Sequence, residues 1–193
     1  MDAYRLGYKT AAQSTRFGKK VPADFFPSRP LLRRIQYSKD TELSEQLGAH
    51  IYRENLLGRL ASYLPFNNRH IASFVYDPKR YYIQYRPHEL EDKAIKDTIL
   101  THELEHKKQW EDPNWRKLSD RRSELLATLA ELKHMLKNYP KHPYLKELPE
   151  RFQFFMADTE SERQREREEL QEVLTPKVDP KILKKWSPVL TEN

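Results

Sequence analysis

Two long helical patterns follow each other in the middle of this chain and limit the folds that are open to it. In the first, over residues 89–110, apolar residues recur at the spacing of a helix. A loop at 111–114 ends it, and the second pattern runs over 118–138 until Pro140 closes it. The second pattern has one apolar stripe, made of Leu118, Leu125, Leu129, Leu132 and Leu136. The sequence therefore predicts a pair of long helices.

A β-hairpin is predicted just before these helices. Residues 71–76 and 81–85 are rich in β-branched and aromatic side chains, and Asp77-Pro78-Lys79-Arg80 lies between them as a turn. Further upstream, apolar spacing predicts one helix over 40–63, which begins at a cap at Asp40 or Thr41. We expect an α+β fold, mainly helical, with a hairpin or small sheet before the first long helix.

Both ends of the chain differ in character from this middle part. Residues 1–39 hold three prolines and little periodicity beyond a short helical pattern at 3–15, which predicts an irregular arm. The tail 176–193 is predicted as an extended arm that Trp186 anchors.

Between Pro140 and this tail the sequence predicts one charged helix, over 160–174, behind the capping box Thr159-x-x-Glu162. That helix has too few apolar positions to enter a core, so we expect it to be solvated or to dock on a partner. The predicted segments are an N-terminal arm (1–39), a folded domain (40–140) and a Pro-rich, charged C-terminal extension (141–193).

Charge and hydropathy exclude several classes of function. The 35 Lys and Arg exceed the 29 Asp and Glu by six, but both signs are interleaved, so a nucleic-acid partner is not expected. No apolar run approaches the roughly 18 residues of a membrane span, and the first residues lack the apolar segment of a secretory signal. We expect a protein of the cytoplasm that does not enter membranes.

The chain has seven His and no Cys. Disulfides, thiol nucleophiles and cysteine-based zinc sites are therefore excluded. Any metal site in this protein must be built from His and carboxylate side chains.

One motif has the spacing of such a site. His102-Glu103-Leu104-Glu105-His106 is an H-E-x-x-H sequence inside the first long helix. Residues four apart lie on one helix face, so both imidazoles can reach the same metal ion. Glu103 lies at the edge of that face, where it can accept a proton from a water without being a ligand. Two His, a third protein ligand and a water form the usual catalytic arrangement of zinc.

The position of the motif in its helix strengthens this interpretation. Such a string is expected by chance about 0.02 times in a chain of this composition. On a helical projection His102 and His106 share a sector with Ile95, Ile99 and Trp110, while a second buried sector holds Leu100 and Leu104. The two His thus point where a packed or liganded side chain is required. The alternative is a pair of core histidines with buried hydrogen-bond partners.

With this motif the chain resembles the zincin metallopeptidases, in which a sheet precedes the H-E-x-x-H helix and a following helix gives a third ligand. The order hairpin, motif helix and second helix is present over residues 70–139. One position departs from the family, which prefers an uncharged residue where this chain has Glu105. The projection places Glu105 on the solvent side, so the departure matters little.

The resemblance implies a third ligand of gluzincin type, because the Gly and His that continue the motif in metzincins are absent from 107–114. Seventeen residues separate His106 from Glu124, a gap similar to that of gluzincins. Asp120 and Glu131 are alternatives, and His134 is a weaker one. The oxyanion of the reaction could be stabilised by one of four residues: Arg121, His134, Tyr139 or His142.

The sequence therefore predicts a Zn²⁺-dependent metallopeptidase that acts on a peptide or protein, with His102, His106 and Glu124 as ligands and Glu103 as general base. It resembles the compact peptidases of mobile elements and the minimal metallopeptidase-like proteins of tailed bacteriophages. The alternative is a structural or interaction protein, such as a virion component, that assembles with itself or with other proteins through its arms and charged helix. Deletion of 158–193 would then abolish assembly and leave the core folded.

Overall fold

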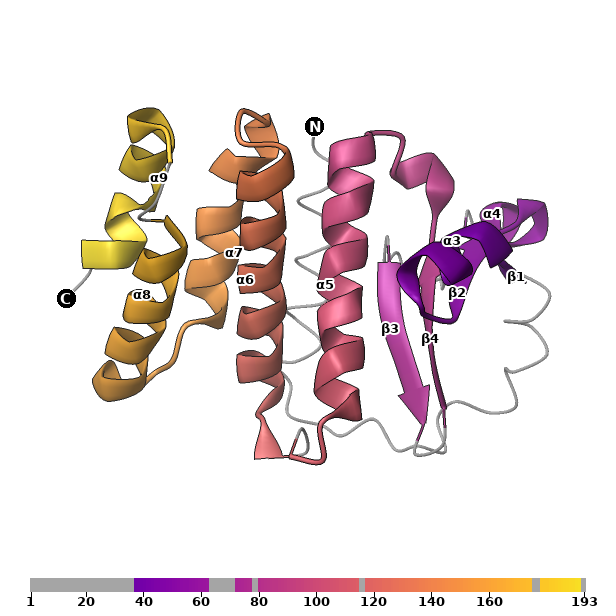
Figure 1. Ribbon diagram of the computed structural model, residues 1–193, viewed down its shortest axis with the longest axis horizontal. Coiled ribbons are helices and arrows are strands. Elements are labelled where there is room, and N and C mark those ends of the chain that lie inside the picture. The colour runs from indigo at the N-terminus through magenta and orange to yellow at the C-terminus, as the bar shows by residue number, and fades with distance from the viewer. Residues whose placement is uncertain (1–36, 63–71, 78–79, 115–116, 175–177, 192–193) are drawn as a thin grey trace. The chain divides into compact units, whose positions relative to one another are not determined.

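The computed structural model describes residues 37–62, 72–77, 80–114, 117–174 and 178–191. Contacts group the chain into two compact units, Met1–Glu91 and Asp92–Asn193, and each unit is considered by itself. The described residues form seven α-helices and four strands (Figure 1), which confirms the α+β class. The division into 1–39, 40–140 and 141–193 stays a prediction, and the short helix expected at 3–15 lies outside the described residues.

The first unit contains a four-stranded mixed sheet. Its strands β1 (Tyr37–Lys39), β2 (Ile51–Glu54), β3 (Ala72–Asp77) and β4 (Arg80–Tyr85) are ordered β1-β2-β4-β3. The β3–β4 hairpin is antiparallel, as predicted, while β2 runs parallel to β4 and antiparallel to β1. The prediction of an irregular arm is wrong for 37–39, since these residues pair with β2.

Alternation of side chains gives the sheet one buried row. Ile51 and Ile83 are register partners in β2 and β4, and both are fully buried. On the same face Tyr81 stacks on Phe74 of β3 with ring centroids 5.6 Å apart. These contacts pin the register, because a slip by one residue would turn every one of these side chains to the other face.

The single helix expected over 40–63 is wrong. The structure has a short helix α3 (Thr41–Leu47), then β2, then a second short helix α4 (Leu56–Ser62). Gly48 ends α3 with φ of 59°, a left-handed conformation that a helix cannot continue. The chain then turns back, and the Ser44 hydroxyl oxygen accepts a hydrogen bond from the Ile51 amide at 3.0 Å. Strand pairing thus prevails over the helical spacing of the leucines.

The second unit is a helical bundle, drawn from pink to yellow in Figure 1. Both predicted long helices are present as α5 (Lys93–Glu111) and α6 (Asp120–Asn138). They are followed by a 3₁₀ turn η4 (Pro143–Lys146) and by α7 (Leu148–Phe155), α8 (Glu160–Leu174) and α9 (Pro180–Thr191). α5 begins later than expected because Asp92 caps it, and residues Pro87–Glu89 form a separate 3₁₀ turn, η2.

The core of this unit is centred on the predicted leucine stripe of α6. Leu125 and Leu132 are fully buried, Leu129 is nearly so, and Leu136 packs at the edge of the cluster. Leu118, which precedes α6, is exposed instead. The other side of the core comes from α7, α8 and α9, which residues 141–193 supply.

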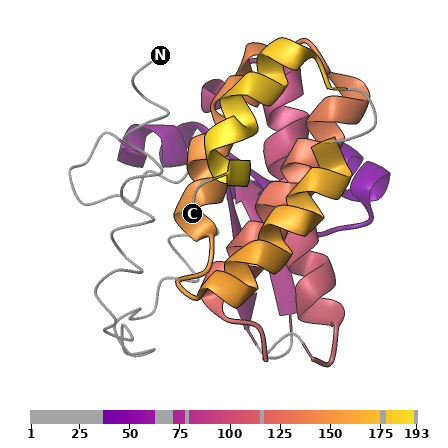
Figure 2. The same ribbon diagram turned by 90° about the vertical axis from the view of Figure 1, so that its left-hand side faces the viewer.

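Both expectations for the C-terminal part are therefore corrected. α8 is not a solvated helix, because Leu170 and Leu174 are buried in the core. The tail is a helix rather than an extended arm, and its fully buried Trp186 is the anchor that was predicted. Pro180 stands at the first position of α9, where proline favours a helix. Figure 2 brings α8 and α9 to the front, and contacts join them to each other, α8 to α6 and α9 to α7.

Candidate metal centre

Side-chain caps fix where α5, which carries the H-E-x-x-H motif, and α6 begin. The Asp92 carboxylate accepts hydrogen bonds from the amides of Ala94 and Ile95 (2.8 and 3.2 Å) and so fixes the start of α5. Ser119 caps α6 in the same way by accepting from the Arg122 amide at 3.2 Å. Both caps are short polar side chains just before a periodic segment, so these starts can be read locally from the sequence.

Contacts near both ends of α5 set how it lies against α6. Thr98 of α5 contacts Met135 of α6, with Oγ1 and Sδ 2.7 Å apart. Eleven residues later, the Gln109 amide donates to the Ser123 carbonyl at 3.1 Å. The residue that lies later in α5 contacts the residue that lies earlier in the sequence of α6, so the two helices are antiparallel. The C-terminal half of α5, which carries the motif, thus faces the N-terminal half of α6.

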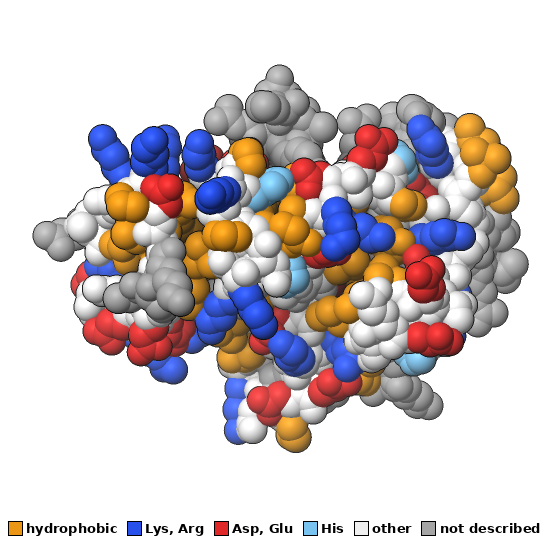
Figure 3. All heavy atoms as spheres, turned by 45° about the horizontal axis from the view of Figure 1, so that its top comes forward, with side chains coloured by type: hydrophobic (Ala, Val, Ile, Leu, Met, Phe, Trp, Pro, Cys, Tyr) orange, Lys and Arg blue, Asp and Glu red, His pale blue; other side chains and the backbone are white. Residues whose placement is uncertain are grey.

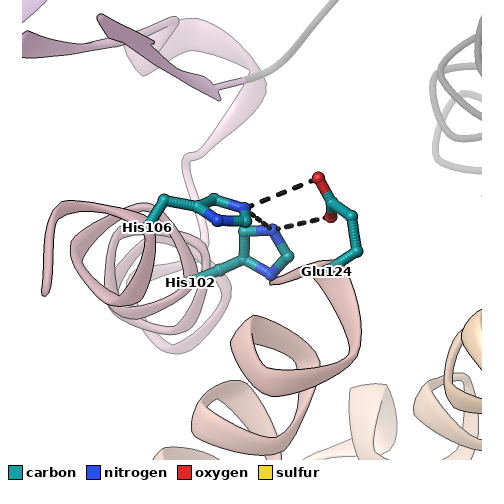
Figure 4. Close-up of side chains that lie close together, drawn as sticks. All are labelled: His102, His106 and Glu124. Atoms are coloured by element: carbon teal, nitrogen blue, oxygen red, sulfur yellow. Dashed lines mark hydrogen bonds and ion pairs between the residues drawn. The ribbon is translucent and has the colours of Figure 1, made fainter. Parts of the chain in front are cut away.

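This pairing brings together the three residues predicted as ligands (Figure 4). The His102 Nε2 lies 3.1 Å from the His106 Nε2. The Glu124 carboxylate reaches both rings, with Oε2 3.3 Å from His102 Nε2 and Oε1 3.5 Å from His106 Nε2. The potential ligand atoms all lie within 4.8 Å of one another. Two nitrogens and a carboxylate from adjacent helices thus converge on one point.

The donor set fits a zinc ion. Two imidazole nitrogens 3.1 Å apart repel each other unless a proton or a cation lies between them. Two His and one carboxylate leave a fourth tetrahedral position for water or substrate, as catalytic zinc requires. The side chain of Glu124 is 38% exposed, against 8% for His102, so the group opens to solvent on the side of the carboxylate.

Charges within the group shift its pKa values strongly. Burial disfavours the imidazolium of His102, but the carboxylates of Glu131 and Glu124 outweigh burial and raise its pKa to about 10. Burial by itself would raise the pKa of Glu124, but the two His outweigh burial and lower that pKa to about 2. Burial and the adjacent charge of His102 both lower the pKa of His106. Without metal, the group therefore holds its proton on His102 at neutral pH.

The outer nitrogen of each ring faces a different partner. His102 Nδ1 is buried and lies 3.1 Å from Glu131 Oε1, a charged contact. His106 Nδ1 faces the neutral groups of Gln109 Oε1 and Ser123 Oγ, each at 3.2 Å. A proton on each Nδ1 would leave both Nε2 lone pairs directed at the common point, which is the tautomer that a metal needs.

Glu103, the predicted general base, is buried next to this group, with 7% of its surface exposed. Its negative charge contributes to the raised pKa of His102. It is not one of the three converging residues. Glu105, on the solvent side, pairs with the exposed Lys108 at 2.9 Å.

The three residues considered as alternative third ligands do not join the group of converging side chains. Asp120 is exposed in the first turn of α6. Glu131 is buried, but it faces Nδ1 of His102 rather than the common point. His134 contacts the Thr101 hydroxyl through Nδ1 at 3.2 Å.

The candidates for oxyanion stabilisation hold other partners. Arg121 donates to the Phe155 carbonyl (2.6 Å) and to Glu166 (3.0 Å). Tyr139 donates to Asp97 at 2.6 Å, and His142 lies 3.1 Å from the Asp92 carboxylate. The structure thus brings together His102, His106 and Glu124, while the oxyanion role stays unassigned.

Sequence reasoning missed two kinds of residue around this group. Gln109 lies three positions after His106 on the same helix face, so the helical spacing could have identified it. Arg151, which binds Glu131, comes from α7 in the segment predicted to lie outside the folded domain. No local signal in the sequence links α7 to the motif.

Comparison with known proteins gives no relative for this arrangement. No protein-family model matches the sequence, and neither the curated proteins nor the solved structures give a match.

The search for membrane spans finds no helix of sufficient length and apolarity among the described residues. Figure 3 shows acidic and basic side chains interspersed on the face that it displays.

Proposed function

We propose that this protein is a zinc-dependent metallopeptidase. The observation that carries the proposal is the convergence of His102, His106 and Glu124 from two adjacent helices, with ligand atoms within 4.8 Å of one another. The zincin-like motif and its helical context support the same reading. The opening of the group to solvent at Glu124 gives a substrate access to it.

Each residue of the site has a role in this proposal. His102 and His106 hold the ion through Nε2, and Glu124 holds it through its carboxylate. When bound, zinc lowers the pKa of a coordinated water toward 7 and polarises a carbonyl group. Glu103 accepts the proton of the attacking water and passes it to the amine that leaves when the peptide bond breaks.

The alternative of a structural or interaction protein has lost one of its arguments. It assumed that the charged helix and tail are available to neighbouring subunits, but α8 and α9 bury their apolar faces in the core of their own unit. That alternative now rests on the charged side chains that α8 leaves exposed and on residues 1–36, which lie outside the described part of the chain.

Metal analysis and one substitution test the proposal. The full chain, equilibrated with zinc and freed of excess by gel filtration, should hold about one zinc per chain. Glu103→Gln should keep that zinc and lose at least a hundredfold in the cleavage rate of a denatured protein substrate, because a general base contributes about 10²–10⁴.

Glu105→Gln is the matched control, since it makes the same change two residues away on the solvent side of α5. It should keep both zinc and activity. A chain with intact His102 and His106 that retains no zinc would refute the proposal, and so would full activity of Glu103→Gln.

A further inference from the structure

Glu131 is the most buried charged group near the candidate metal centre. Its side chain is 1% exposed, and it lies on α6 two turns beyond Glu124. Its Oε1 is 3.1 Å from Nδ1 of His102, the ring nitrogen that points away from His106 and Glu124. A carboxylate in this position cannot share the ion with the three converging groups, but it can decide which ring nitrogen carries a proton.

Arg151 of α7 keeps this carboxylate charged and in place. Its Nη1 lies 2.6 and 2.9 Å from the two oxygens of Glu131 and donates to the Tyr144 hydroxyl at 2.9 Å. Both carboxylate oxygens of Glu131 thus face a guanidinium that is always charged, although the side chain is almost fully removed from water.

We propose that Glu131, held by Arg151, is the positioning residue that sets the metal-binding form of His102. The negative charge beside Nδ1 stabilises a proton there, which leaves the lone pair of His102 on Nε2 facing His106 and Glu124. This inference rests on the proposed zinc site and deepens it: the motif helix gives the ligand, α6 gives its charged partner, and α7 holds that partner.

The two His of the motif are therefore not equivalent. His102 has an anionic partner at Nδ1, which makes its imidazole a stronger donor to a metal. His106 has the neutral Gln109 and Ser123 there. A purely structural ion pair would not need to face a ligand ring. Such a pair exists in the same unit, where buried Glu166 binds Arg121 and the Ala157 amide.

Zinc affinity of the full chain, measured by competition with a chromophoric chelator, tests the role of Glu131. Glu131→Gln keeps the shape of the side chain and removes its charge, so zinc binding should weaken about 10- to 100-fold. Glu166→Gln is the matched control, because it neutralises an equally buried glutamate paired with arginine. The control should change zinc affinity less than twofold. Equal affinities of wild type and Glu131→Gln would overturn the proposal.

Arg151→Met tests whether the arginine acts through Glu131. It should weaken zinc binding in the wild-type background and have no further effect in Glu131→Gln, since residues of one network are not additive. If Arg151→Met weakened zinc binding as much in the Glu131→Gln background as in the wild type, the inference that Arg151 acts through Glu131 would be overturned.

A spectroscopic readout on the wild type does not depend on any variant being folded. In ¹⁵N-histidine NMR spectra of the zinc-loaded chain, His102 should show a protonated Nδ1 and a metal-bound Nε2. Zinc on Nδ1 of His102 would overturn the inference while leaving the zinc site and the proposed function standing. A chain that binds no zinc would instead refute the proposed function itself, and this inference with it.

Discussion

Trp186 of α9 packs edge to face on Phe152 of α7, with ring centroids 6.0 Å apart and an interplanar angle of 68°. Both side chains are fully buried. Phe152 directly follows Arg151, the residue that holds Glu131 beside His102. α9 therefore supports α7 by packing, and α7 in turn carries Arg151, which contacts the candidate metal centre through Glu131.

Trp186→Ala should destabilise the protein by about 3–5 kcal/mol, because it removes a large buried side chain and leaves a cavity against Phe152. Urea denaturation followed by circular dichroism measures the loss. Leu183→Ala, one turn earlier on the exposed side of α9, is the control and should cost less than about 1 kcal/mol. Equal stability of the two variants would contradict the packing described for α9.

Deletion of residues 158–193 should unfold the second unit rather than release a folded core. The deletion removes Leu170, Leu174 and Trp186 from the cluster that covers the leucine stripe of α6. Each large apolar side chain is worth about 1.5–3 kcal/mol when buried, so the loss of these three removes about 4.5–9 kcal/mol from a domain whose unfolding free energy is ordinarily about 5–15 kcal/mol. A cooperative thermal transition in the truncated chain would contradict this expectation.

Zinc binding should release about one proton per ion at pH 7, and affinity should rise about tenfold for each pH unit between 5 and 7. The sign follows from His102, whose pKa of about 10 keeps its Nε2 protonated until the metal displaces that proton. Glu124, with a pKa lowered to about 2, is already ionised and adds no proton. Calorimetry in buffers of different ionisation enthalpy counts the protons, and affinity that is independent of pH would contradict this assignment.

Gly48→Ala should destabilise the first unit by about 1–2 kcal/mol, because the residue has φ of 59° and a Cβ is strained there. The cause is the backbone alone, since a Cβ at Gly48 would meet no atom within 4 Å. Gly48→Asn should cost less, because asparagine tolerates the left-handed conformation. Equal losses for the two variants, measured by thermal denaturation, would point to a steric cause instead.

The second unit was predicted best where the signal is local. The spacing of His102 and His106 and the leucines of α6 all act within a few turns of one helix. The Asp92 cap is just as local, but it was missed, and α5 was expected to begin at residue 89. α9 shows the limit of this reasoning. Ile182, Trp186 and Val189 do repeat at helical spacing, yet the tail was predicted as an extended arm.

The helix predicted over 40–63 failed for a related reason. Its leucines have helical spacing, yet residues 51–54 complete the sheet between β1 and β4, which are distant in the sequence. Hydrogen bonds to partners elsewhere in the chain decide such a segment, and local propensity does not encode them.

By itself the sequence determined a pair of His on one helix face, a glutamate beside them, and the absence of any thiol to share a metal. A helical repeat is enough for that, because neighbours at i and i+4 meet whatever the rest of the chain does. Only the tertiary structure decided that Glu124 rather than Glu131 joins the two His, and that Glu131 and Arg151 lie behind His102. Those contacts cross from one helix to another, so they depend on helix packing, which no local pattern in the sequence specifies.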